Sequence, residues 1–360
     1  MTMSRHWNRR RWLTAVAALA YPGSCPLACV SRDVAARFSF PRDHGAHPAT
    51  LTEWWYITGC LQDQAGGALG MQITFFRSRP RVQEGNPSAF APRQLLFAHA
   101  ALSDPGTQRL QQDQRAARVG FGIAEASEET TAVHIDDWTL MLEDGRYRSH
   151  IAARAFDFAL AFVPAQPLLL QGQGGFSRKG PLPGEASCYY SFPQLAATGT
   201  ITVAGRSRLV SGRAWLDHEW SNNYLGKAAS GWDWMGINLD DGSALMAFRI
   251  RARRGGEYWT SATHRTADGA VNTLAPLAVR FQPLRHWRSP HTGVDYPVGM
   301  RVRAGDLVLD LHPLMDDQEL DSRATTGAIY WEGAVEASSA GRVVGRGYLE
   351  LTGYAAPLQL

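Results

Sequence analysis

Several features that mark common protein classes are missing from this sequence. Its net charge of +3 is spread over 360 residues, and no basic block occurs beyond the N-terminus. That charge pattern gives no electrostatic basis for nucleic-acid binding. Helical periodicity is nearly absent, and the apolar run at residues 12–21 is too short to span a bilayer. We therefore expect the protein to bind a small apolar or lipid-like partner and not to bind nucleic acid.

Familiar catalytic motifs are also absent. The chain has no His-Glu-x-x-His metal helix, no Gly-x-Ser-x-Gly elbow, no phosphate-binding loop and no dinucleotide fingerprint. No serine or cysteine nucleophile stands out. The spacing of His99, His218 and Glu219 does not indicate a metal site. The sequence therefore predicts neither a cofactor nor a metal.

The N-terminus has the order of an export signal. Arginines up to Arg11 precede the short apolar run, and small residues follow it, so residues 1–30 are predicted to be a signal peptide. Arg9 and Arg10 before Trp12 resemble a twin-arginine signal. The expected location is the periplasm or cell envelope. The sequence PLAC at residues 26–29 allows an alternative to simple cleavage. In this alternative a lipid is attached to Cys29, and the protein is associated with a membrane.

Two further cysteines leave two interpretations open. Cys60 and Cys188 could pair in an oxidising compartment, or they could be two buried thiols on strands.

Most of the remaining chain reads as strands. Apolar or alternating segments are separated by glycine-rich turns, which is typical of an antiparallel barrel or sandwich. These segments include WWYITGCL, LGMQITFF, LLFAHAAL, AFDFALAFV and GTITVAG in the first half, and SALMAFRIRA, MRVRAGDLVLDLHPL and GRGYLELTGY in the second. The fold class is predicted to be all-β.

A faint internal repeat indicates two related barrels. Residues 53–77 resemble residues 231–251, each with an aromatic strand, a turn and an apolar strand that ends in arginine. A polar, glycine-containing link lies between Asp217 and Gly231. We therefore expect an N-terminal domain over residues 40–225 and a C-terminal domain over residues 226–360. The alternative is that any two aromatic hairpins look alike.

The densest group of functional side chains is RAWLDHEW at residues 213–220. On a strand, Asp217 and Glu219 share one face, and His218 and Trp220 share the other. In an apolar cavity, desolvation and like-charge repulsion raise the pKa of at least one carboxylate and leave it protonated at neutral pH. The alternative is a strand end whose charges form salt bridges with arginines.

Aromatic residues supply the candidate walls of such a cavity. The motif EWWY places Glu53 and Trp55 on one strand face and Trp54 and Tyr56 on the other, and GWDWM places Trp232 and Trp234 on one face. Aromatic faces stabilise a developing cation. His99 and Tyr190 are further candidates for substrate contact. The alternative for all of them is ordinary core packing.

These segments together resemble a known family. TEWWYITG, QITFFRS, FAHAALSD, ASCYYSFPQL, GRAWLDHEWS, YWEGAV and GRGYLELTGY are similar to carotenoid 1,2-hydratases (hydroxyneurosporene synthase, CrtC-type) and their AttH-like secreted relatives, over residues 40–357. The resemblance implies two lipocalin-like antiparallel β-barrel domains. Hydratases of the family add water to a terminal double bond of an acyclic carotene without a redox cofactor, and related fungal members act as pericyclases.

The same resemblance assigns roles to individual residues. It implies that Asp217 protonates the alkene. It places Trp55, Trp220 and Trp232 where they stabilise the cation, and it lets Glu219 or His218 orient the water. Two other functions stay open: a secreted hydrolase of an envelope lipid or ester, and a lipocalin-like carrier that binds an apolar ligand without turnover.

Overall fold

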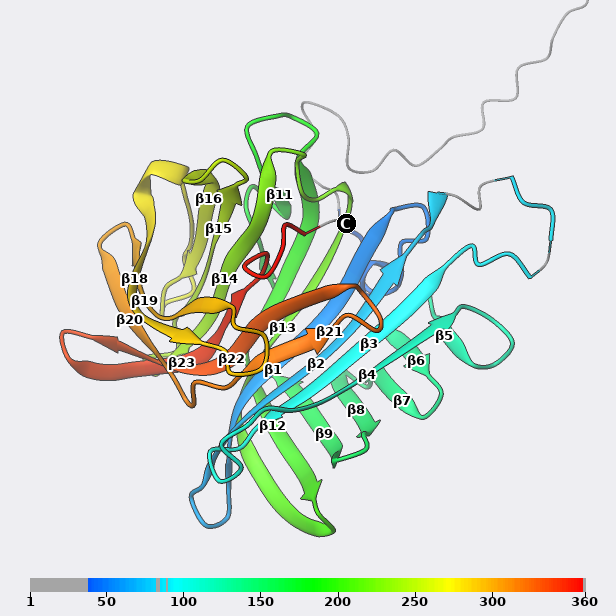
Figure 1. Ribbon diagram of the computed structural model, residues 1–360, viewed down its shortest axis with the longest axis horizontal. Helices are drawn as coiled ribbons and strands as arrows, with labels where there is room; N and C mark the ends of the chain where they lie inside the picture. The colour runs from blue at the N-terminus through cyan, green and yellow to red at the C-terminus, as the bar shows by residue number, and fades with distance from the viewer. Residues whose placement is uncertain (1–37, 82–84, 89, 359–360) are drawn as a thin grey trace, which may run out of the picture.

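The computed structural model describes residues 38–81, 85–88 and 90–358. Nearly all of the regular structure in these residues is strand, arranged in two antiparallel sheets that pack against each other (Figure 1). The predicted all-β class and the lipocalin-like barrel architecture are confirmed. The predicted signal peptide and Cys29 lie outside the described residues. No described helix has the length and hydropathy needed to cross a membrane.

The first sheet follows a short 3-10 helix, η1 (Arg42–His44), and runs in the order β4-β3-β2-β1-β13-β12-β9-β8-β7-β6-β5. Two short strands, β10 and β11, pair with β12 beside this path. The strands are β1 (Thr52–Asp63), β2 (Ala68–Ser78), β3 (Leu95–Ser103), β4 (Gln111–Arg118), β5 (Ala124–Ala126), β6 (Ala132–Ile135), β7 (Trp138–Glu143), β8 (Arg146–Ala152), β9 (Phe156–Pro164), β10 (Leu169–Leu170), β11 (Phe176–Arg178), β12 (Ala186–Val203) and β13 (Arg206–Asn223).

The second sheet runs in the order β17-β16-β15-β14-β23-β22-β20-β19-β18, with β21 paired to β22. A further 3-10 helix, η3 (Pro276–Ala278), precedes β18. The strands are β14 (Ala229–Leu239), β15 (Ala244–Ala252), β16 (Glu257–Arg265), β17 (Val271–Leu274), β18 (Val279–Arg288), β19 (Asp295–Ala304), β20 (Leu307–Pro313), β21 (Glu319–Ser322), β22 (Ala328–Ser339) and β23 (Arg342–Leu351).

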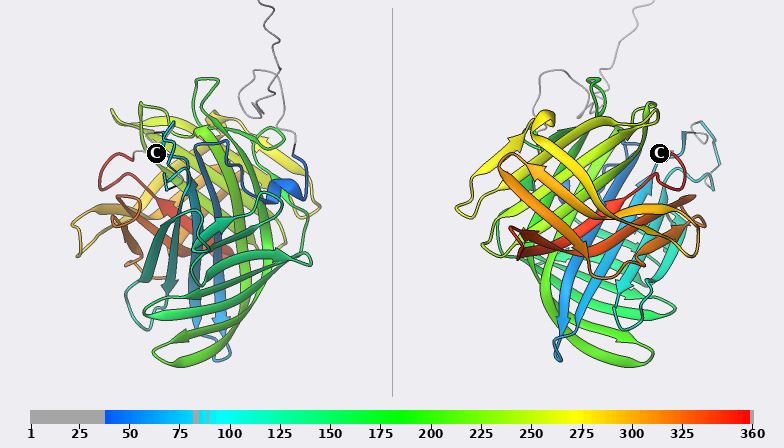
Figure 2. Two further views of the ribbon diagram at one scale, coloured as in Figure 1. Left: turned by 90° about the vertical axis from the view of Figure 1, so that its right-hand side faces the viewer. Right: turned by 60° about the vertical axis from the view of Figure 1, so that its left-hand side comes forward.

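Each sheet curls so that strands from opposite ends of its order approach each other (Figure 2). In the first sheet, the Arg115 guanidinium on β4 donates to the backbone carbonyl of Ile135 on β6, at 3.1 Å. In the second, Arg249 on β15 donates to the carbonyl of Phe281 on β18, at 3.0 Å. These bonds join strands that are not neighbours in the strand order of their sheet.

Side-chain alternation divides the core into separate layers. Along β1, Trp55 and Ile57 point into the core of the first barrel, whereas Tyr56 joins an apolar cluster between the two sheets. A strand buried on both faces reads as a continuous apolar run rather than an alternating one. This explains the unbroken WWYITG segment, and it places the central strands of both sheets at their common interface.

At Gly70 the two sheets come into close contact because glycine has no side chain. A Cβ atom at Gly70 on β2 would lie 2.6 Å from the Cβ of Ala334 and 2.7 Å from the hydroxyl of Tyr348, both in the second sheet. Such separations are shorter than van der Waals contact. Gly70 therefore allows the second sheet to pack directly on β2.

We expect Gly70→Val to lower the free energy of unfolding by about 1–3 kcal/mol, because added atoms at a packed interface force the sheets apart. Urea denaturation followed by tryptophan fluorescence measures the change. Ala68→Val, at an exposed position on the same strand, is the matched control. Equal stability of the two variants would show that the interface tolerates the extra volume.

The two cysteines on strands of the first sheet do not pair with each other. Cys60 on β1 is a free thiol, and burial raises the pKa of that thiol to about 12. The interpretation in which Cys60 and Cys188 form a disulfide is therefore wrong.

Candidate active site

A cavity of about 290 Å³ lies between the two sheets. Its walls combine aromatic rings with carboxyl groups, and both sheets contribute both kinds of side chain. The rings include Trp54, Tyr56, Phe76, Tyr189, Tyr224, Trp232, Trp234 and Tyr330, and the carboxyl groups include Asp217, Glu219, Glu332 and Glu350. A concave, mostly apolar site with a few converging polar groups is the usual form of a small-molecule site.

The first-sheet wall follows from the pairing of β1 and β12 with β13. Tyr56 lies directly opposite Asp217, Trp54 opposite Glu219, and Tyr189 also opposite Glu219 from the other side. Directly opposed residues of antiparallel strands project from the same face. These five side chains therefore all reach the cavity.

Asp217 is a buried carboxyl group held by three donors. Tyr189 donates its hydroxyl hydrogen to Oδ2 at 2.6 Å, while Ser191 and Trp215 donate to Oδ1 at 2.5 and 2.6 Å. Burial raises the pKa of Asp217 to about 7, and the charge of Glu219 adds to this rise although the three hydrogen bonds oppose it. A substantial fraction of Asp217 therefore carries a proton at neutral pH.

Glu219 lies on the same face in a different electrostatic environment. Lys179, itself buried, places its ammonium nitrogen 2.7 Å from Oε1 of Glu219. The ammonium also lies over the rings of Tyr189, Tyr224 and Phe248, at 4.8, 4.9 and 4.3 Å from their centroids. Glu219 is thus neutralised by an ion pair, and Asp217 is the carboxyl group free to give up a proton to a ligand.

The second-sheet wall holds two carboxyl groups that the sequence analysis missed. Glu332 on β22 and Glu350 on β23 lie directly opposite each other, and Trp234 on β14 lies opposite Glu350. Trp232 donates its indole hydrogen to Glu350 at 2.9 Å. The signal in the sequence was a single glutamate inside each of two apolar strands, YWEGAV and GYLELTG.

His99 is one of the residues that line the cavity. Its ring nitrogens lie 2.9 Å from the hydroxyls of Tyr330 and Thr325. Burial lowers the pKa of His99 to about 3, so the ring is neutral at physiological pH. It links the first sheet to the second through hydrogen bonds.

Four other predicted site residues do not reach this cavity. Trp55, Tyr190, His218 and Trp220 all point into the core of the first barrel, because they alternate with Tyr56, Tyr189, Asp217 and Glu219 along their strands. The prediction that Trp55 and Trp220 flank the same ligand as Asp217 is therefore wrong in position. So is the placement of His218 and Tyr190 beside that ligand. Tyr189 contacts Asp217 instead.

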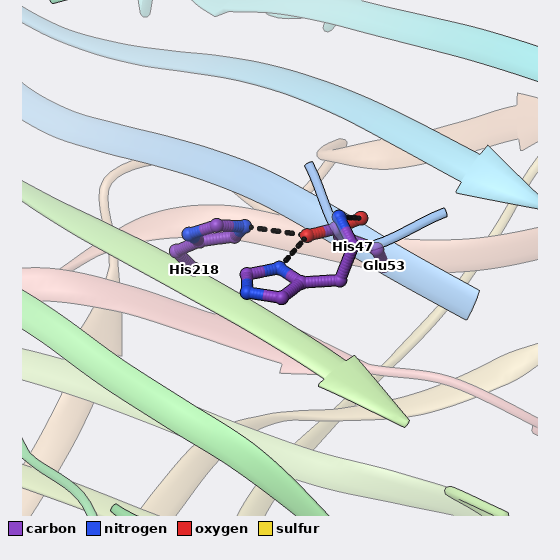
Figure 3. A group of neighbouring side chains, drawn as sticks. All are labelled: His47, Glu53 and His218. Atoms are coloured by element: carbon purple, nitrogen blue, oxygen red, sulfur yellow. Dashed lines mark hydrogen bonds and ion pairs between the residues drawn. The ribbon is translucent and has the colours of Figure 1, made fainter. Parts of the chain in front are cut away.

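Glu53 and His218 belong to a second polar cluster with His47, on the barrel side of β1 and β13 (Figure 3). Oε1 of Glu53 lies 2.7 Å from Nδ1 of His47 and 2.9 Å from Nε2 of His218. Arg77 donates to Oε2 at 2.6 Å. The ring of His47 stacks on Trp220, with centroids 3.7 Å apart.

The three possible ligand atoms of this cluster lie within 4.8 Å of one another, which is close enough to contact one metal ion. As placed, however, both ring nitrogens point at the same oxygen of Glu53. Burial opposes ionisation of Glu53, but the bonds from His218 and His47 and the charge of Arg77 hold its pKa well below the usual value. The arrangement is thus a closed hydrogen-bond network that ties η1 and its following loop to β1 and β13.

Comparison with known proteins assigns the chain to a family. The profile of the AttH-like family matches residues 32–354, so the chain belongs to that family. The crystal structure of NE1406 from Nitrosomonas europaea, a candidate AttH, is 50% identical and superposes with a TM-score of 0.85, covering 91% of this chain and 99% of that one. No curated protein sequence matches the chain.

Two more distant structures share the fold. Kievitone hydratase from Nectria haematococca is 15% identical, with a TM-score of 0.69 over 91% of this chain and 96% of its own. CghA in complex with Sch210972 is also 15% identical, with a TM-score of 0.52 over 86% and 90%.

Proposed function

We propose that this AttH-like protein is a cofactor-independent hydratase that adds water to a carbon–carbon double bond of an apolar, isoprenoid-like substrate, a carotenoid 1,2-hydratase type of reaction. The observation that carries the proposal is Asp217, a buried carboxyl group with a pKa near 7 in an aromatic cavity, which forms no ion pair within the described residues. The fold shared with a kievitone hydratase is consistent with it.

The residues of the cavity suit the chemistry of alkene hydration. Protonation of an alkene carbon by the Asp217 carboxyl group breaks the π bond and leaves a tertiary cation on the neighbouring carbon. Such a cation survives only in a site that excludes bulk water and surrounds it with polarisable faces. The rings of Tyr56, Trp232 and Trp234 line the space next to Asp217 and supply those faces. One water then adds to the cation.

The predicted export signal supports a proposal on where the reaction takes place. We place the reaction outside the cytoplasm, where a lipid-soluble alkene would reach the protein from a membrane face.

Incubation in H₂¹⁸O tests the reaction type. The purified full chain is given lycopene or 2-methylhept-2-ene, which carry the same dimethylvinyl end group, and a phospholipid in a parallel reaction. We expect a tertiary alcohol that contains one ¹⁸O atom, detected by mass spectrometry. Release of ¹⁸O-labelled fatty acid would favour a hydrolase, and recovery of bound but unaltered ligand would favour a carrier; either result would contradict hydration.

A further inference from the structure

The cavity wall formed by the second sheet carries its own pair of buried acids. Glu332 and Glu350 occupy directly opposed positions on β22 and β23, where Cβ atoms lie about 4.5–5.5 Å apart. Glu332 is only 4% exposed, and both side chains line the cavity. Among the described residues no lysine or arginine forms an ion pair with either one. Two unpaired buried acids in opposed positions lower the stability of the fold, so stability alone does not explain their presence.

Their proximity dictates their protonation. Ionisation of one carboxyl group at directly opposed positions in a site of low dielectric opposes ionisation of the other, so the pair tends to keep at least one proton. Burial raises the pKa of Glu350 to about 7, with the charges of Asp217 and Glu219 adding to the rise. Burial and the charge of Glu350 raise the pKa of Glu332 further. The pair can therefore accept a proton while Asp217 donates one.

Two polar groups from opposite walls of the cavity lie close to each other. Oε1 of Glu332 and the hydroxyl of Tyr56 are both buried, and the phenol of Tyr56 interacts with the carboxyl group of Glu332. Tyr56 lies opposite Asp217 on the facing sheet, and the charge of Glu332 acts on its phenol. The two atoms thus bracket the space between the acid and the glutamate pair.

We propose that the Glu332–Glu350 pair is the base of the reaction, binding the attacking water and taking its proton. The inference rests on the proposed hydration and adds a second set of catalytic residues to it. Asp217 gives a proton to one alkene carbon, and the water oxygen forms a bond to the cationic carbon. The ionised member of the pair then accepts a proton from that oxygen. One proton returns from the pair to Asp217 through water, which restores the starting state.

The assignment also predicts a ligand class. A negative charge next to aromatic faces binds a tertiary ammonium ion, which has the charge and shape of the tertiary cation. Dodecyldimethylamine, protonated at neutral pH, is therefore expected to bind in the cavity and to compete with alkene substrates.

Deuterium exchange separates the acid from the base. In ²H₂O, Asp217 delivers deuterium to 2-methylhept-2-ene. When the pair is replaced (Glu332→Gln with Glu350→Gln), the cation forms but is captured slowly. Hydration should fall about 100-fold or more. Exchange of deuterium into the recovered alkene should continue, because the cation loses a proton back to Asp217. Glu350→Gln alone serves as a second, milder variant if the double variant folds poorly.

The ammonium probe gives a readout that needs no turnover. Calorimetry should show at least about a tenfold loss of dodecyldimethylamine affinity in the double variant. Glu336→Gln, on the same strand but exposed and paired with Arg346, should leave affinity and hydration unchanged.

Failure of the inference differs from failure of the proposed function. A parallel fall of hydration and deuterium exchange, or unchanged ammonium affinity in the double variant, would reduce the pair to a structural role and overturn the inference. If the wild type neither hydrates nor exchanges any tested alkene, the proposed function itself fails, and the inference fails with it.

Discussion

Asp217→Asn is expected to lower the rate of alkene hydration by about 10²–10⁴-fold, the usual contribution of a positioned general acid. The amide has nearly the same shape as the acid, but it cannot transfer a proton to carbon. The cavity walls and the Lys179–Glu219 ion pair are untouched, so an apolar ligand should still bind. Steady-state hydration of 2-methylhept-2-ene gives the rate, and the change in tryptophan emission when the same alkene binds gives the affinity.

Two matched variants sharpen this result. Asp306→Asn changes an exposed aspartate in the turn between β19 and β20 and should leave the rate unchanged. Glu219→Gln removes the neighbouring carboxylate and leaves Lys179 without its partner, so it is expected to lower the pKa of Asp217. The alkaline limb of the rate profile, where Asp217 loses its proton, should then shift to lower pH. Retention of most of the hydration activity by Asp217→Asn would remove Asp217 from the acid role.

Alternation along single strands could be predicted from the sequence, and the structure agrees with it. The sequence placed Asp217 with Glu219, and Trp232 with Trp234, on shared faces, and these side chains line one cavity. A period of two residues is a local property of an extended chain, so it needs no knowledge of the fold.

Which strand faces meet could not be predicted, because that depends on register. Tyr189 and Tyr190 are equivalent in the sequence. The pairing of β12 with β13 decides between them by setting Tyr189 opposite Glu219 and Tyr190 opposite His218. A shift of one residue would reverse the choice. The two bulges in β12 show why counting residues along the strand does not fix this register.

The glutamates of the second sheet illustrate a different limit. Glu332 and Glu350 each stand alone in an apolar strand, and each reads as an isolated charge in a core segment. They become a pair because β22 and β23 form a hairpin with those two positions opposed, and they become part of the site because that hairpin packs on β1 and β2. Long-range packing of this kind leaves no pattern in either segment.

The burial that makes Asp217 an acid also makes it costly for the folded state, and Asp217→Asn should reveal this through pH. The pKa of Asp217 is about 7 when folded and close to 3.8 when unfolded, so the folded protein binds the proton more tightly. The stability that this proton provides is complete below pH 4 and is lost as the pH rises to 7. The loss amounts to about 4 kcal/mol.

Asparagine does not ionise, so the Asp217→Asn variant does not show this loss of stability as the pH rises. The free energy of unfolding of Asp217→Asn relative to wild type should therefore increase by about 4 kcal/mol between pH 4 and pH 8, whatever its offset at pH 4. Urea denaturation of both proteins across this range measures the difference. Buried acids whose pKa does not depend on the charge of Asp217 titrate alike in both proteins, so their effects cancel. A difference independent of pH would mean that Asp217 ionises normally in the folded state, and then it could not hold a proton for an alkene at neutral pH.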